Sequence, residues 1–137
     1  MAWVVDTCLL LDIGLDDPEF AEASEKLLGA KLADGLVVCP VTFVELAPAF
    51  SGQLRQQEEF LFRLGIGCRE GWAWEDTVSA GEAWARHVRK RRSNQAPRRP
   101  VADVLIGAFA LRFQGLLTRN APDFRKHFPQ LSVAGPQ

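Results

Sequence analysis

Acidic side chains stand at the ends of several apolar segments of this chain, and carboxylates placed in this way can bind a metal ion or transfer protons. Asp6 comes directly after Ala2 to Val5, a short apolar run that is rich in strand-forming residues. If this run is a strand of a parallel sheet, Asp6 lies at the carboxyl edge, where such sheets bind ligands. The alternative is that Asp6 only caps the turn from Thr7 to Leu11.

Two further acids occupy comparable places. Glu45 lies on a helix expected from Pro40 to Phe50, which follows a second apolar run, Leu36 to Cys39. Asp103 lies in the first turn of the most apolar helix of the chain, which begins at Pro100. The helix dipole favours both acids. However, an acid that enters a packed interior is costly unless it is paired or coordinates a cation.

Polar residues also follow the strand expected at Gly115 to Thr118. The carboxyl-edge positions of four elements therefore carry Asp6, Glu45, Asp103, and either Asn120 or Asp123. Carboxylates that are buried together raise one another's pKa unless a cation is present. Oxygen ligands without His or Cys favour Mg²⁺ or Mn²⁺ over zinc, and Mg²⁺ held by carboxylates usually acts on phosphates.

Length and composition predict one domain, residues 1–137, with one core. A hydrophobic fraction of 47% with 24% charged residues is typical of globular proteins. The chain has no apolar run of membrane-spanning length and no signal peptide, so we expect a cytoplasmic protein without a membrane partner. Cys8, Cys39 and Cys68 lie too far apart for a disulfide framework or a paired metal motif, and we expect all three to be buried.

The basic residues are unevenly distributed, although the net charge is only -1. Seven of the 16 fall between residues 86 and 99, where there is no acid: Arg86, Arg89, Lys90, Arg91, Arg92, Arg98 and Arg99. This basic window could bind an anion, or it could be an ordinary solvated face. The two histidines, His87 and His127, have neighbours typical of helix surfaces, and we expect them to face solvent.

The remaining pattern alternates helices with short buried strands. We expect a helix from Pro18, capped by Asp17, a helix from Gln53 to Leu64, and a turn at Gly65 to Gly67. The segment from Cys68 to Trp74 is ambiguous: if it is a short edge strand, Trp72 and Trp74 on one face would cover the core. A long helix begins at Glu75, a loop spans Ser93 to Pro100, a helical turn covers Phe124 to Phe128, and Leu131 to Val133 form the last strand. This order predicts an α/β sandwich with a predominantly parallel sheet.

The order of these motifs resembles the PIN-domain family, and more narrowly the VapC-type ribonuclease toxins of bacterial and archaeal toxin-antitoxin pairs. The motifs are Asp6-Thr7 after the first strand, Glu45 after the second, Asp103 in the segment from Val101 to Ala108, and the segment from Leu117 to Phe124. The resemblance covers nearly the whole chain, and the order and spacing of the motifs are far more specific than any one of them. It implies a PIN-like three-layer sandwich, with helices on both sides of a central, mostly parallel sheet.

The resemblance also implies an activity, a cofactor and partners. The chain would be an endoribonuclease, dependent on Mg²⁺ or Mn²⁺, that cleaves single-stranded regions of structured RNA. It would form a homodimer and be silenced by a cognate antitoxin.

Residue roles follow from the same resemblance. Asp6 and Asp103 would be the principal metal ligands, and Glu45 a further ligand or a residue that positions water. Thr7 or Thr118 would orient the carboxylates. Many relatives have Asp directly after the Thr-Arg pair, where this chain has Asn120, and others have an acid three residues later, where it has Asp123. We favour Asp123 as the fourth catalytic acid, with Asn120 as a neutral ligand or a group that positions water.

The basic window then acquires two possible roles, because it precedes Asp103 in the sequence. Its arginines, Arg86, Arg89, Arg92, Arg98 and Arg99, would contact either the RNA backbone or an acidic segment of the antitoxin.

Two rival functions remain at this stage. A PIN-fold binding or scaffold module with little or no activity would be consistent with Asn120, although Asp6, Glu45 and Asp103 are all retained. A phosphotransfer receiver or an aspartyl phosphatase also gathers acids at a sheet edge. A receiver would need a lysine in the segment from Leu116 to Asn120, which has none, and a phosphatase would need an acid at the position of Cys8.

Overall fold

A five-stranded sheet forms the centre of the protein in the computed structural model, which describes residues 1–94 and 101–136. Its strands are β1 (Trp3–Val5), β2 (Leu36–Val37), β3 (Ile66–Gly67), β4 (Gly115–Leu117) and β5 (Val133–Ala134). Their order in the sheet is β3-β2-β1-β4-β5, and every neighbouring pair is parallel. The chain therefore adds strands on one side of β1 first and on the other side later, which makes the β1–β4 junction the topological switch point.

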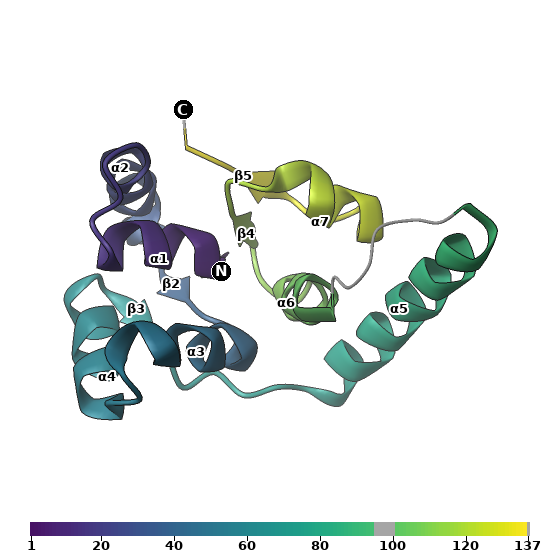
Figure 1. Ribbon diagram of the computed structural model, residues 1–137, viewed down its shortest axis with the longest axis horizontal. Coiled ribbons are helices and arrows are strands. Elements are labelled where there is room, and N and C mark those ends of the chain that lie inside the picture. The colour runs from purple at the N-terminus through teal and green to yellow at the C-terminus, as the bar shows by residue number, and fades with distance from the viewer. Residues whose placement is uncertain (95–100, 137) are drawn as a thin grey trace.

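Seven α-helices connect and cover these strands in the described part of the chain. They are α1 (Thr7–Gly14), α2 (Ala21–Lys31), α3 (Pro40–Leu46), α4 (Leu54–Arg63), α5 (Trp74–Asn94), α6 (Val101–Ala110) and α7 (Ala121–His127). Helices α1 to α4 lie on one side of the sheet, and α5 to α7 lie on the other (Figure 1). This arrangement confirms the three-layer α/β sandwich.

The alternation of side chains along each strand separates two apolar cores. Val4 and Leu116 belong to the cluster that packs against α5, α6 and α7, whereas Val5 and Leu117 belong to the cluster beneath α1 to α4. Strands β1, β2 and β4 are buried on both faces, as the continuous apolar runs in the sequence indicate, whereas β3 and β5 at the sheet edges are less buried. The length of the chain predicts a single core, but the sheet divides the core into two.

Close packing of α6 and α7 depends on Gly107. A Cβ atom added at this position would come within 2.6 Å of the Phe128 ring, just beyond the end of α7. Glycine therefore lets the two helices approach each other, and their first turns carry Asp103 and Asp123. Among the helices described, none is long and apolar enough to cross a membrane.

Several element boundaries differ from the sequence-based predictions. Ile66 and Gly67 form the edge strand β3 instead of a turn, and the chain beyond them has no strand at Trp72 or Trp74. Trp72 stacks on Phe109, but Trp74 is 78% exposed and does not cover the core. Edge strands of two residues are too short for a periodic pattern, which explains the first error.

Helix boundaries differ in smaller ways. Helix α2 begins at Ala21 rather than Pro18, although Asp17 still accepts hydrogen bonds from the backbone N–H groups of Glu19 and Phe20. Helix α5 continues through Ser93 and Asn94, into the segment where we expected a loop, and the rest of that loop lies outside the described residues.

Candidate active site

Asp6 lies at the switch point of the sheet, directly beyond the end of β1. Its backbone N–H donates to the carbonyl of Leu117 in β4, so the two strand ends are held together. Its carboxylate Oδ1 accepts a 2.8 Å hydrogen bond from the Thr7 N–H at the start of α1. The capping role proposed as the alternative is therefore present, but this role uses only one of the two carboxylate oxygens.

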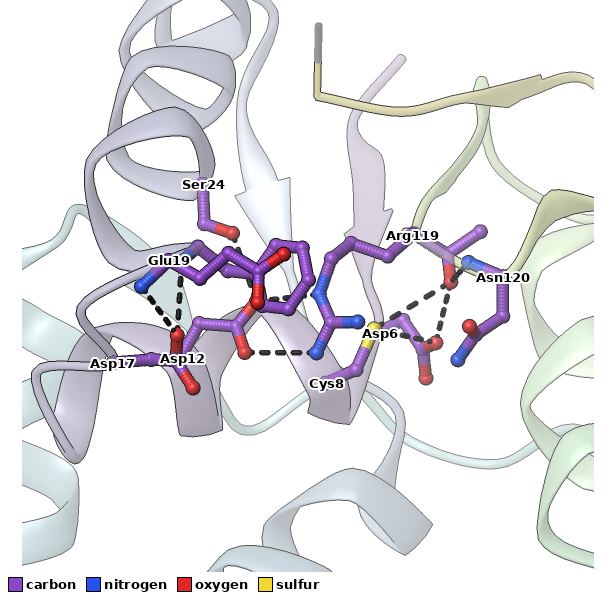
Figure 2. Close-up of polar contacts among 10 residues, drawn as sticks. Asp6, Cys8, Asp12, Asp17, Glu19, Ser24, Arg119 and Asn120 are labelled. Carbon is purple, nitrogen blue, oxygen red and sulfur yellow. Dashed lines mark hydrogen bonds and ion pairs between the residues drawn. The ribbon is translucent and has the colours of Figure 1, made fainter.

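The second oxygen of Asp6 is held by side chains. The Thr118 hydroxyl donates to Oδ2 at 2.6 Å, and the Cys8 thiol lies 3.3 Å from the same atom (Figure 2). Thr118 in turn accepts a hydrogen bond from the backbone N–H of Asn120. Burial raises the pKa of Asp6 although these hydrogen bonds lower it, and the charge of Glu45 raises it further.

Glu45 reaches the site from α3 through Thr7. The Thr7 hydroxyl donates to Oε1 of Glu45 at 2.6 Å and lies 3.0 Å from the hydroxyl of buried Thr42. Thr7 thus connects the start of α1 with α3. Glu45 itself is exposed, so its carboxylate stands at the rim of the site rather than within it.

Asp103 lies in the first turn of α6 and is half-buried. Its pKa is raised to about 6, first because burial disfavours the charged form, and then because Asp6, Asp123 and Glu45 are close enough to repel that charge. The four acids that the sequence analysis singled out therefore share one electrostatic environment, although they come from four separate elements.

The two candidates for the fourth acidic position occupy different places. Asp123 lies in the exposed first turn of α7, from which its charge acts on Asp103. Asn120 is the residue just before α7, and its side chain makes no capping hydrogen bond to the helix. Its backbone N–H supports Thr118. Which of the two completes the site stays a prediction.

The donor atoms of this site fit a divalent cation in chemistry and in charge. They are carboxylate oxygens, and a cation would offset both the burial and the repulsion from neighbouring acids that raise the pKa of Asp103. Within residues 1–94 and 101–136, no three acidic, histidine or cysteine side chains meet closely enough to form a complete metal shell. The site therefore fits a divalent cation in the type and the charge of its ligand atoms.

An ion pair that the sequence analysis missed lies beside this site. Arg119 donates to both carboxylate oxygens of Asp12 in α1, from Nε and from one terminal nitrogen, each at 2.8 Å (Figure 2). Ser24 of α2 donates to the same carboxylate, and the guanidinium lies over the Phe20 ring, 4.0 Å from its centroid. Asp12 is buried among apolar residues of α1, and this is the signal that could have revealed it.

The basic window is only partly described. Arg86 and Arg89 are exposed on α5, and Arg86 donates to the backbone carbonyl of His127. Arg92 belongs to the end of α5, whose side chains lie outside the description, and Arg98 and Arg99 lie outside the described residues.

The expected burial is wrong for both histidines and for two of the three cysteines. His87 and His127 are buried and contact each other, with ring centroids 5.5 Å apart, where α5 approaches the end of α7. Cys8 and Cys68 are only partly buried, whereas Cys39 is fully buried as expected. Cys8 lies at the acidic site, where burial and the charge of Asp6 raise the pKa of its thiol to about 11.

Comparisons with known proteins agree with this architecture. The family model described as the PIN domain matches residues 3–126. The fold is similar to that in a crystal structure of VapBC2 from Rickettsia felis bound to a DNA fragment from its promoter, with a TM-score of 0.70, 16% identity and 100% coverage of both chains. It is also similar to VapBC-1 from nontypeable Haemophilus influenzae, with a TM-score of 0.69, 18% identity and 98% coverage of both chains. No curated protein matches the sequence.

Proposed function

The chain belongs to the PIN domain family, and from this premise we propose that it is a VapC-type toxin: an endoribonuclease, dependent on Mg²⁺ or Mn²⁺, that hydrolyses single-stranded regions of structured RNA. PIN domain proteins are nucleases that generally use divalent metal ions. The likeness to two VapBC structures supports the narrower assignment to the VapC type.

The observation that carries this proposal is the shared electrostatic environment of the four acids. Asp103 experiences the charges of Asp6, Asp123 and Glu45 at once, at the carboxyl end of a parallel sheet. Such a cluster of acids lowers the stability of the fold, and a bound cation that also binds phosphate removes this destabilisation. A purely structural acid at a helix N-terminus would not need three acidic neighbours.

In this proposal Asp6 and Asp103 are the principal metal ligands, and Asp123 and Glu45 complete the site. A bound divalent ion would supply charge neutralisation for the scissile phosphate and a nucleophilic water at neutral pH. The residues of the chain do the rest. Thr118 fixes one oxygen of Asp6, and Thr7 orients Glu45, so that both carboxylates meet the substrate in defined positions.

The basic window supports RNA as the substrate. Arg86 and Arg89 are exposed on α5. This helix packs against α6, which carries Asp103. Positive side chains in this place would hold the phosphate backbone near the acidic site. An acidic antitoxin segment could occupy the same positions when the toxin is silenced.

An antitoxin and a second copy of the chain are the proposed protein partners. Large apolar side chains are exposed on α3 and α4, with Val44 at 71% and Phe62 at 81%, and exposed apolar residues that gather on one side of a protein often mark an interface. Light scattering on the purified protein, alone and with the antitoxin, would measure both associations.

Cleavage of total cellular RNA by the purified protein tests the function. We expect discrete fragments with Mg²⁺ or Mn²⁺, none with EDTA, and none with the Asp103→Asn variant. Asp34→Asn, which neutralises an exposed acid remote from the site, is the matched control and should cleave normally. The fragments should carry 5′-phosphate and 3′-hydroxyl ends, and 2′,3′-cyclic phosphate ends would contradict the metal-dependent mechanism.

The alternative is a PIN-fold scaffold that binds metal or RNA without cleaving. The asparagine at position 120 and the absence of a complete metal shell among the described side chains favour it. Saturable Mn²⁺ binding without cleavage of any cellular RNA would support the scaffold. Cleavage that requires Asp103 would exclude it.

A further inference from the structure

A small basic cavity lies between α5 and α7, and its lining includes none of the four acids of the candidate active site. Six residues line it: Ala83, Arg86, His87, Lys90, Lys126 and His127. Three of these carry a positive charge, and no acid is present among the described residues that line the cavity. Its volume is about 50 Å³. This volume would hold roughly three to five water molecules, so the cavity has room for a tetrahedral oxyanion but not for a nucleoside.

His87 gives this cavity a second, independent feature. Its side chain is only 3% exposed, and within the described part of the chain neither Nδ1 nor Nε2 has a hydrogen-bond partner. The ring is held in place by Trp84, which stacks on it, and by His127, which meets it edge to face. A buried polar side chain without a partner costs free energy, and this cost is recovered when a ligand supplies the partner.

The charges around the cavity decide the type of ligand. A metal ion would be bound by the two imidazoles but repelled by Arg86, Lys90 and Lys126. An oxyanion would be attracted by all three and could accept a hydrogen bond from an imidazole. Burial lowers the pKa of His127, and His87, Lys126 and Lys90 lower it further, whereas Asp123 raises it. The surroundings of His127 therefore disfavour the positively charged form of its imidazole, and a bound anion would reduce this electrostatic cost.

We propose that the cavity between α5 and α7 is a phosphate-binding site that takes a phosphate monoester or inorganic phosphate through His87, Lys126 and Arg86. The phosphate group is either free or the terminal phosphate of an RNA strand whose nucleoside stays outside the cavity. A phosphate bound in this cavity would contact both α5 and α7, and α7 carries Asp123.

Nuclear magnetic resonance of the histidine rings tests this site directly. The chain has only two histidines, and both line the cavity, so each ring signal reports on it. Inorganic phosphate is titrated at pH 7 in EDTA, with NaCl at equal ionic strength as the control. We expect saturable shifts of both ring signals with phosphate but not with NaCl. Equal shifts in the two titrations, or none, would mean that the cavity holds only water, and would overturn the proposal.

Two variants locate the binding. Lys126→Gln removes one charge of the cavity and should weaken phosphate binding roughly tenfold, the usual effect of losing a charge-assisted hydrogen bond. Lys26→Gln, on exposed α2, is the matched control and should bind phosphate normally. His87→Phe keeps a ring against Trp84 but removes both nitrogens, so phosphate should no longer move the His127 signal. Unchanged binding in Lys126→Gln and His87→Phe would overturn the proposal.

Short RNA oligonucleotides distinguish the two sources of phosphate. If a 5′-phosphorylated oligonucleotide binds more tightly than inorganic phosphate, the ligand is the end of an RNA strand; if it binds equally or more weakly, the ligand is free phosphate. A 5′-hydroxyl oligonucleotide that shifts the ring signals equally would overturn the requirement for a monoester. These measurements need neither metal nor cleavage, so they remain valid whether or not the chain is a nuclease.

Discussion

The orientation of the Asp6 carboxylate depends on the hydroxyl of Thr118. It donates to Asp6 and accepts from the Asn120 N–H, so its orientation is set from both sides. Thr118→Val keeps the shape but removes the donor. We expect this variant to lower Mn²⁺ affinity and RNA cleavage by about 10–100-fold, as is typical when a partner of a metal ligand is lost. Isothermal calorimetry and cleavage rates measure the two effects.

The matched control for this variant is Thr77→Val. Thr77 is exposed on α5 and accepts a hydrogen bond from Trp72, far from Asp6. This control should retain normal metal affinity, because exposed substitutions usually have small effects. Normal metal affinity in Thr118→Val itself would contradict the orienting role.

Asp103 makes the stability of the metal-free protein depend on pH. Its pKa is raised in the folded state to about 6 from an ordinary value of 3.8, so the folded protein binds this proton more tightly than the unfolded chain does. The resulting destabilisation is absent below the ordinary pKa, grows as the pH rises, and is complete above pH 6. Asp103→Asn should therefore raise the Tm at pH 8 by about 3–5 °C, after allowance for solvent screening, with a smaller gain at pH 4.

Thermal unfolding in EDTA at the two pH values measures this difference. Asp34→Asn, at an exposed position, should show no such pH dependence. A gain for Asp103→Asn that is as large at pH 4 as at pH 8 would mean that the charge of Asp103 is not the cause.

The sequence predicts the neighbours of some residues in the fold but not of others. Asp6, Glu45 and Asp103 could be predicted to lie near one another, because each follows or begins an apolar element and parallel sheets bring such ends together. The contact between His87 and His127 could not be predicted, since helix periodicity does not say which helices pack together. Asp12, like Asp103, is an acid in an apolar helix and could have been noticed for that reason, but its partner Arg119 is distant in sequence.

At the scale of elements, the ion pair between Asp12 and Arg119 fastens α1 to the segment that joins β4 to α7. Arg119 directly follows Thr118, so this ion pair also fixes the position from which Thr118 reaches Asp6. A double-mutant cycle with Asp12→Asn and Arg119→Gln should give a coupling energy of about 2 kcal/mol, below the range for fully buried pairs because Arg119 is partly exposed. Urea unfolding measures the coupling, and cleavage rates should fall in both single variants.

The exposed pair between Arg63 and Glu59 on α4 is a natural control for this cycle. These residues are four positions apart on one helix, and their side chains are 75% and 54% exposed. Their coupling should be only about 0.3–0.5 kcal/mol. An equally small coupling between Asp12 and Arg119 would show that the ion pair does not fasten the two elements.

Elements with a continuous apolar run or an apolar helix could be predicted from the sequence, whereas an element without such a pattern could not. Helix α6 is evident because its residues are apolar all round, and β1 and β4 are continuous apolar runs. Strand β3 contains only two residues and could not be distinguished from a turn. Helix α5 extends further than expected because nothing in Ser93 or Asn94 prevents another turn of helix.

The distribution of charge is a property of the whole molecule, and it makes a prediction about RNA binding. The net charge of -1 would weaken RNA binding if it were spread evenly, but the basic window gives the molecule one positive segment. Binding of single-stranded RNA to the Asp103→Asn variant should therefore weaken steeply with salt. Each phosphate contact contributes a slope of about -0.7 to the logarithm of affinity against the logarithm of salt concentration.

Arg89→Gln, within the basic window, should reduce the magnitude of this slope by about 0.7, the contribution of one phosphate contact. Arg55→Gln is the matched control, because Arg55 is an exposed arginine on α4, on the other side of the sheet. Its slope should equal that of the parent protein. If both variants lowered the slope equally, RNA would respond only to the total charge of the molecule. A reduction confined to Arg89→Gln would mean that the RNA lies along α5, because only a local contact distinguishes two variants of equal net charge.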